Sequence, residues 1–146
     1  MKYAQIVEVL GGDSVVTRPV TGELDLVELV RAGLTKSALF HLADAFQFTQ
    51  SEIANIFNLS LRTVQRFKQQ EREEELLDQA VSDRVVQLAD LYAYGREVLG
   101  EAIFQKWCQT SLRTLGGKRP KDLLFTSVGI EMVKDELIRI EYGVYS

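Results

Sequence analysis

The chain has 146 residues, of which 17 are basic and 21 acidic, so its formal net charge at pH 7 is -4. A composition of 46% hydrophobic and 26% charged residues is typical of a folded protein and excludes a chain that is disordered throughout. The length predicts one domain, or a small module with a satellite. The negative net charge excludes nucleic-acid binding by the surface as a whole, so such binding would need a local basic patch.

Targeting and redox signals indicate a cytoplasmic protein. No apolar run approaches the 18 or so residues of a membrane-spanning helix, and residues 1–20 lack the basic start and apolar core of a signal peptide. The single cysteine, Cys108, cannot form an intramolecular disulfide, and its place in the apolar run AIFQKWC predicts a buried side chain. We therefore expect a cytoplasmic protein with no membrane partner.

Apolar residues recur at helical spacing along most of the chain, which predicts an all-α fold. In the first half, helices are expected from residue 4 to Leu10, from Thr21 to a stop at Gly33, and from a Thr35 cap to Phe46. The segment SVVTRPV, residues 14–20, is β-branched and contains a proline, so we expect an extended link or an edge strand there.

His41 is the only histidine of the chain, and it falls within the third of these helices. It has no cysteine or carboxylate at a repeating metal-ligand spacing. We therefore interpret it as a surface or boundary residue.

The stretch TQSEIANIFNLSLRTVQRFK, residues 49–68, has the pattern of a helix-turn-helix. Ser51 is expected to cap the first helix, Asn58 to adopt the left-handed conformation in the turn, and Ser60 to cap the second helix. The outward positions of that second helix carry cationic and amide side chains and no acid, as a DNA-reading helix requires. The predicted DNA-binding residues are Ser60, Arg62, Thr63, Gln65, Arg66 and Lys68. An ordinary helical hairpin with a polar face is the alternative.

The second half of the chain is also expected to be helical. A long helix is predicted from about Gln79 or Ser82 to Leu99, followed by a shorter one over residues 101–110. Pro120 suits the first position of another short helix. A last helix is expected to end at Gly143, with an apolar stripe formed by Ile130, Val133, Leu137 and Ile140.

No motif in the sequence provides catalytic chemistry. There is no phosphate-binding glycine loop and no cluster of metal ligands, and the LGGK at 115–118 lacks the upstream glycine and following hydroxyl of a P-loop. We therefore expect a protein that is not an enzyme and that uses no cofactor and no metal.

Six segments follow one another in a specific order: VLGG at 9–12, RAGLTKSAL at 31–39, SLRTVQRF at 60–67, SDRVVQLADL at 82–91, LGGKRPKDLL at 115–124 and IEYGVYS at 140–146. Through this order, and above all through the last two segments, almost the whole chain resembles the Xre/MbcA/ParS-type antitoxins that are paired with RES-domain toxins. The chain departs from the family pattern in two loops. The family usually has a Pro-Asn pair where residues 111–114 stand, and a smaller residue at Asn58.

The resemblance implies an all-α, homodimeric antitoxin with two parts. An N-terminal helix-turn-helix (Xre-like) DNA-binding module is expected over residues 1–78, with the helix-turn-helix itself at about 49–70. A small helical C-terminal toxin-binding domain, which also carries dimerisation, is expected over 79–146. The helix from about Gln79 to Leu99, with Tyr92 and Tyr94 on it, is expected to form part of the dimer interface.

The resemblance also implies the two activities and the partners. The antitoxin represses its own operon through operator DNA, and it inhibits a RES-domain toxin that consumes NAD, in a higher-order toxin–antitoxin complex. Its C-terminal end is expected to enter or cover the toxin's active site. Two other functions stay open: a stand-alone helix-turn-helix regulator without a toxin, and an interaction adaptor that no longer binds DNA. A neighbouring gene for a RES-type protein would exclude the first, and salt-dependent binding to promoter DNA would exclude the second.

Two aromatic residues close to the end of the chain suggest a segment that a partner covers. A carboxylate at Ser146 can meet a basic group that would otherwise bind an anionic cofactor. Lys118, Arg119 and Lys121 form a basic cluster, which is most often a solvated surface; of these, Lys118 and Arg119 are expected to serve the surrounding interface or DNA. The alternative is that Tyr142 and Val144 pack on the protein's own helices. The predicted toxin-binding residues are Lys118, Arg119, Arg139, Glu141, Tyr142, Gly143, Val144, Tyr145 and Ser146.

Overall fold

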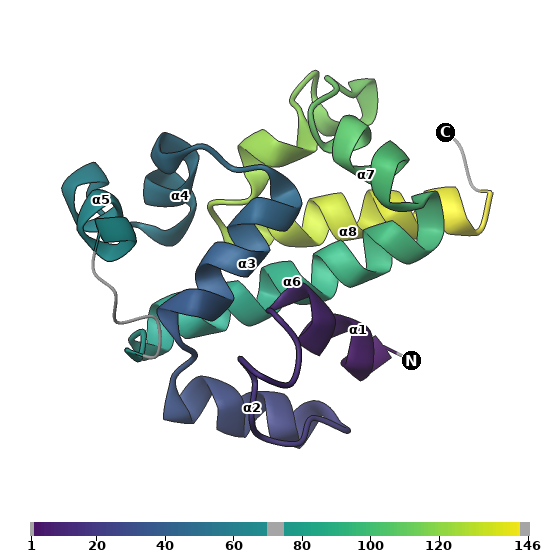
Figure 1. The fold of residues 1–146 in the computed structure, drawn as a ribbon. Helices are drawn as coiled ribbons and strands as arrows, with labels where there is room; N and C mark the ends of the chain where they lie inside the picture. Colours follow the sequence, from purple (N-terminus) through teal and green to yellow (C-terminus); the bar gives the residue numbers. More distant parts are fainter. Residues whose placement is uncertain (1, 70–74, 144–146) are drawn as a thin grey trace.

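The computed structural model describes residues 2–69 and 75–143, and this part of the chain is all-α, without a β-strand (Figure 1). Two isolated bridges, Thr35 with Leu76 and Leu112 with Lys118, are its only extended pairings. The elements in chain order are α1 (Lys2–Val9), α2 (Glu23–Ala32), α3 (Lys36–Phe46), α4 (Gln50–Phe57), α5 (Leu61–Gln69), α6 (Gln79–Leu99), α7 (Glu101–Cys108), the 3₁₀ turns η1 (Arg113–Leu115) and η2 (Pro120–Leu123), and α8 (Ser127–Glu141).

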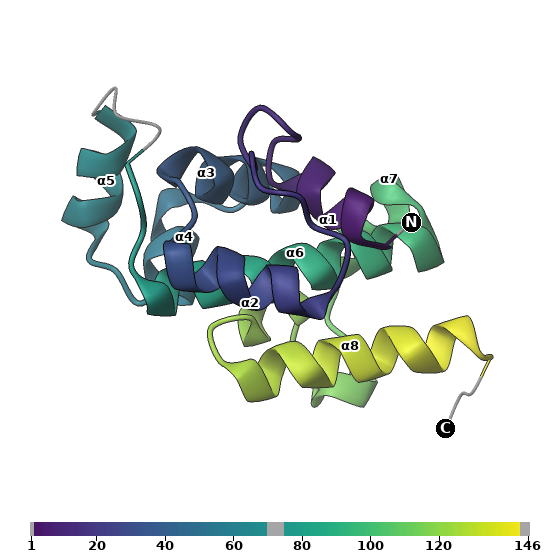
Figure 2. The same cartoon turned by 90° about the horizontal axis from the view of Figure 1, so that it is seen from below.

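Helix α6 is the central element of the fold. Its 21 residues pack against α1, α2, α3, α7 and α8. Figure 2 shows α6 between α1 and α3 on one side and α8 on the other, while α4 and α5 project at one end. A helix that is covered on several sides must be apolar nearly all round, and ten of its residues are buried. The stripes of α1, α3 and α8 supply the facing apolar side chains.

An aromatic cluster fills the space where α3, α6 and α7 meet. The Tyr92 ring lies 5.0 Å from Phe46 and 5.2 Å from Phe104, both in edge-to-face geometry. The Tyr92 hydroxyl donates to the Glu101 carboxylate, and burial together with that carboxylate raises the pKa of Tyr92 to about 12. Tyr92 is 1% exposed, so its expected role in a dimer contact is wrong: its own chain already covers it.

The helices follow the local signals of the sequence at most of their ends. Thr35 caps α3 by accepting a hydrogen bond from the Ala38 amide, and Pro120 is the first residue of η2. Helix α8 ends at Glu141, two residues before Gly143, which has φ of 67°. The segment at 14–20 is an irregular link, because its β-branched residues find no neighbouring strand to pair with.

Cys108 is 2% exposed at the end of α7, as its apolar surroundings in the sequence predict. Burial raises the pKa of the thiol to about 12, although the nearby Lys121 ammonium acts in the opposite direction. The thiol therefore stays protonated at neutral pH and packs as a small apolar side chain.

None of the helices within residues 2–69 and 75–143 is long and apolar enough to cross a bilayer.

Gly129 provides a test of the packing between η2 and α8. A Cβ atom at this position would meet the backbone oxygen of Leu123. Alanine is favoured over glycine inside a helix by about 1 kcal/mol, but a backbone atom cannot move away as a side chain can. We expect Gly129→Ala to lower the free energy of unfolding by about 1–3 kcal/mol in urea titrations.

Gly22→Ala is the matched control, because the Gly22 backbone is extended and a Cβ there would meet nothing within 4 Å. Equal stability of the two variants would contradict the tight contact at Gly129.

Candidate DNA-binding and toxin-binding sites

Helices α4 and α5 form the helix-turn-helix, joined by a turn in which Asn58 is left-handed with φ of 54°. Thr49, and not Ser51, caps α4. The Thr49 hydroxyl accepts from the Glu52 amide at 3.1 Å, and the Glu52 carboxylate accepts from the Thr49 amide at 2.8 Å. This reciprocal pair is a capping box, which requires Glu or Gln three residues after the cap. Ser51 has Ala54 at that position, so the expected Ser51 cap is wrong.

The N-terminus of α5 is closed by Ser60, as the sequence predicts. Its hydroxyl accepts from the Thr63 amide at 3.0 Å and donates to the Thr63 hydroxyl at 2.8 Å. Two of the predicted DNA-binding side chains are therefore engaged with each other inside the cap. Their contribution to DNA binding would come through the exposed helix end that they organise.

The remaining predicted DNA-binding side chains are exposed on α5. The helix buries Val64 completely. At 100° per residue, Arg62 and Arg66 point about 160° away from Val64, into solvent. Lys68 is only about 40° from Val64, and its ammonium lies 6.0 Å from the Phe40 ring of α3. Arg62, Gln65 and Arg66 thus form the outward face, and Lys68 lies on its flank.

The predicted toxin-binding residues fall into two groups. Lys118 and Arg119 precede the N-terminal end of α8, whereas residues 139–143 lie at its C-terminal end. The 15 residues of α8 span about 22 Å, so the structure does not bring the two groups together. Residues 144–146, which include Val144, Tyr145 and Ser146, lie outside the described part of the chain.

At the C-terminal end of α8, Tyr142 is 72% exposed. This exposure argues against the alternative that its ring packs on the protein's own helices. Glu141 accepts a hydrogen bond from Tyr94; burial and this carboxylate raise the pKa of Tyr94 to about 12. Arg139 pairs with Glu136 at 2.8 Å.

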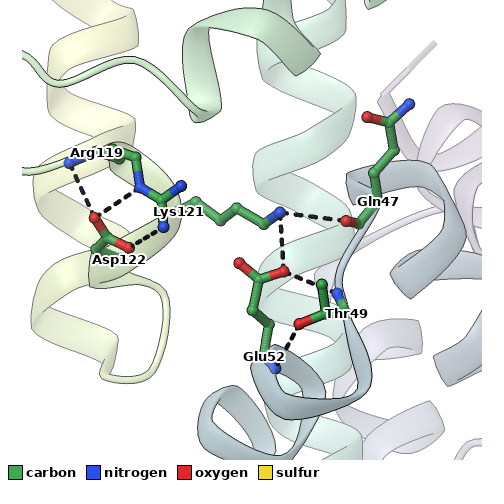
Figure 3. Close-up of polar contacts among 6 residues, drawn as sticks. All are labelled: Gln47, Thr49, Glu52, Arg119, Lys121 and Asp122. Atoms are coloured by element: carbon green, nitrogen blue, oxygen red, sulfur yellow. Dashed lines mark hydrogen bonds and ion pairs between the residues drawn. The ribbon is translucent and has the colours of Figure 1, made fainter.

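The basic cluster at 118–121 is not a free cationic surface (Figure 3). The Arg119 guanidinium donates two hydrogen bonds to the Asp122 carboxylate, of 3.0 and 2.7 Å, and thereby holds the pKa of Asp122 below its usual value. The Lys121 side chain is 6% exposed, and its ammonium contacts the Glu52 carboxylate at 2.9 Å and the Gln47 carbonyl at 3.2 Å. Lys121 is therefore occupied by contacts within its own chain, and Lys118 is the exposed cation of the three.

The outer face of α8 carries large apolar side chains, of which only Tyr142 was predicted as a site residue. Their exposed fractions range from 38% to 72%, and they are Val128, Met132, Ile138 and Tyr142. Val128, Met132 and Ile138 can be recognised in the sequence as apolar residues outside the buried stripe of this helix. Beside Ile138 and Tyr142, a groove of about 450 Å³ lies against α1 and α6, where Lys134 and Asp90 pair at 2.7 Å.

Comparison with known families separates the same two parts of the chain. Residues 25–90 match the antitoxin Xre-like helix-turn-helix domain, and residues 95–143 match the antitoxin Xre/MbcA/ParS C-terminal toxin-binding domain. A search of curated proteins found no match. The chain therefore belongs to the Xre-type antitoxins, proteins of toxin–antitoxin systems that join a DNA-binding helix-turn-helix to a toxin-binding domain.

These matches confirm the resemblance to Xre/MbcA/ParS-type antitoxins and the fold class, whereas the pairing with a RES-domain toxin stays a prediction. The border between the two matched regions falls inside α6, and one core runs continuously through the helices on either side of it. The division at residue 78 stays a prediction.

The capping box at Thr49 and Glu52 gives a pH-dependent prediction. Burial alone would raise the pKa of Glu52, but hydrogen bonds from Thr49 and Lys121 and the Lys121 charge outweigh it, so the pKa lies below its ordinary 4.5. A carboxyl whose pKa is lower in the folded state stabilises the fold above its unfolded-state pKa, and this contribution is lost as the pH falls through the folded value.

We expect Glu52→Gln to lower the free energy of unfolding by about 1 kcal/mol at pH 7, and the difference from the wild type to shrink as the pH falls below 4.5 and through the lower pKa of the folded state. Urea titrations across this range measure it. Glu131→Gln, at an exposed carboxylate of α8, is the control and should change stability little at any pH. A Glu52→Gln difference that persists unchanged at pH 3 would contradict the assignment.

Proposed function

We propose that this antitoxin neutralises a RES-domain toxin that consumes NAD, and that its residues from Tyr142 onward block the toxin's active site. The observation that carries the proposal is the exposed Tyr142 at the end of the apolar outer face of α8. That face lies within the region that matches the toxin-binding domain. Aromatic side chains that fill a desolvated pocket contribute most of the energy in many interfaces, so Tyr142 is suited to an anchor.

The same protein represses its own operon by binding operator DNA through α5. Figures 1 and 2 both place α5 at one end of the molecule and the C-terminal end of α8 at the other. This separation favours a complex in which DNA and toxin are bound at the same time. The antitoxin acts in the cytoplasm, where the operator lies.

We further propose that the antitoxin binds DNA as a homodimer within a higher-order complex with its toxin. One recognition helix covers few base pairs, and a two-fold protein on a two-fold operator doubles the number of contacts. Since Tyr92 is buried, the dimer contact must use other side chains. Half-buried Tyr94 stays a candidate.

Arg62 tests the DNA-binding face. If its guanidinium contacts a base, Arg62→Ala is expected to cost about 1–3 kcal/mol of specific binding to the promoter of the protein's own operon. Gel-shift titration measures the effect. Arg113→Ala, at an exposed cation of η1, is the control and should bind the promoter like the wild type. Unchanged affinity of Arg62→Ala would contradict the assignment, and toxin neutralisation should survive either change.

Deletion of residues 142–146 tests the blocking role. The deletion leaves the buried stripe of α8 and the helix-turn-helix intact, so folding and promoter binding should persist. Loss of an aromatic anchor from a desolvated pocket costs on the order of 2–4 kcal/mol, which would weaken inhibition strongly. The readouts are the melting temperature and the NAD content of cells that express the toxin encoded beside this protein.

Val128→Ser is the control for this deletion, because it changes the outer face of α8 far from Tyr142. It is expected to weaken the complex while any antitoxin that stays bound still inhibits. A truncated protein that melts earlier and yet still protects cells would rule out the blocking role. If a tagged antitoxin purified from its native operon brings down no RES-type protein, the stand-alone regulator becomes the better explanation.

A further inference from the structure

Lys121 links the two matched regions of the chain. It belongs to the toxin-binding region, but its side chain reaches the turn between α3 and α4, directly before the helix-turn-helix (Figure 3). The ammonium lies 2.9 Å from Glu52 and 3.2 Å from the Gln47 carbonyl, and the side chain is 6% exposed. A lysine this deeply buried needs hydrogen-bonding partners at defined positions, so the contact is specific in position.

The Glu52 oxygen that Lys121 contacts is also the oxygen that completes the capping box of α4. Glu52 Oε1 accepts from the Thr49 amide at 2.8 Å and from Lys121 Nζ at 2.9 Å. This single oxygen atom therefore contacts both the N-cap of α4 and a side chain of the toxin-binding region. A second side chain from that region, Gln105, donates to the Ala45 carbonyl at 2.8 Å, in the last turn of α3.

The placement of α5 depends on α4. Helix α5 packs mainly on α4, and it buries Val64 completely and Phe67 in part. The far end of α4 is held by Arg84 of α6, which donates to the Ile56 carbonyl at 3.2 Å. Lys121 and Arg84 thus hold the two ends of the helix on which the recognition helix rests.

We propose that Lys121 is a positioning residue for DNA recognition: a side chain of the toxin-binding region that fixes the angle of α4, and through it of α5, without touching DNA. The inference rests on the proposed binding of promoter DNA by α5. Without Lys121 the first turn of α4 can move, and α5 then adopts several orientations. Only one of these orientations is able to bind DNA, so the apparent affinity for DNA falls.

Lys121→Met is the test variant, because methionine keeps an unbranched apolar stem next to the Phe48 ring, 5.8 Å from the ammonium. Lys134→Met is the matched control: it removes an ion pair of 2.7 Å to Asp90 that joins α8 to α6 and does not involve α4. Lys106→Met removes an exposed charge from α7 and controls for long-range electrostatics.

Fluorescence anisotropy with a labelled promoter duplex, at several salt concentrations, gives the Kd and the salt slope. We expect Lys121→Met to raise the Kd about tenfold, a coupling of the size found between contacting residues, and both controls to stay within about twofold. The salt slope should be unchanged, because Lys121 is not a phosphate contact. Hydrogen exchange should become faster at the amides of residues 49–53 in Lys121→Met and not in the controls.

Several results would overturn the proposal. Promoter affinity of Lys121→Met equal to that of the controls excludes a positioning role, and a salt slope reduced by about one indicates a direct phosphate contact instead. If Lys121→Met does not fold, Glu52→Gln replaces it, since the amide oxygen still caps α4 while the charge is lost, and wild-type affinity in that variant excludes the role. Failure of the wild type itself to bind the promoter would remove the DNA function and this inference together.

Discussion

The fold depends on the burial of α6 on nearly all sides. Because five helices pack on it, α6 joins the region that matches the helix-turn-helix domain to the region that matches the toxin-binding domain, and a single core serves both. Tyr92 shows how dense this junction is: its ring contacts Phe46 and Phe104, and its hydroxyl is satisfied by Glu101 and Gln105. A rigid centre of this kind lets the two exposed ends of the molecule act as surfaces of one body.

Helices α4 and α5 contribute Ile53, Ile56, Phe57 and Val64 to this core, but they pack less on α6 than the other helices do. Polar contacts at the ends of α4 add to this packing, and polar contacts are directional where apolar packing is not. The Glu52 carboxylate is central because it caps the helix and pairs with Lys121 at the same oxygen. A neutral acceptor could cap α4 equally well, but it would not hold a buried ammonium. The carboxylate therefore explains both the end of the helix and its orientation.

Local features could be predicted from the sequence, and contacts between distant segments could not. The Thr35 and Ser60 caps and the left-handed Asn58 depend on residues within three or four positions. The Thr49 cap could also be predicted from the sequence, since Glu52 follows it at the spacing of a capping box. The burial of Lys121 depends on Gln47, 74 residues away, and no periodicity records such a pairing. Likewise the outer face of α8 reads as apolar from the sequence, but only the fold shows that Val128 and Met132 are left exposed.

The distance between the acidic residues of α8 and helix α5 also explains how a protein with a net charge of -4 can bind DNA. The first turn of α5 has no acid and its last turn has two cations, so the helix itself carries only positive charges. Exposed acids such as Glu131 and Asp135 lie on α8, which extends away from α5 toward the other end of the molecule. At physiological salt the Debye length is about 8 Å, so charges farther away than this are largely screened. The charge on the exposed face of α5 is therefore set by residues close to it, and the acidic, apolar surface of α8 lies too far away to change it.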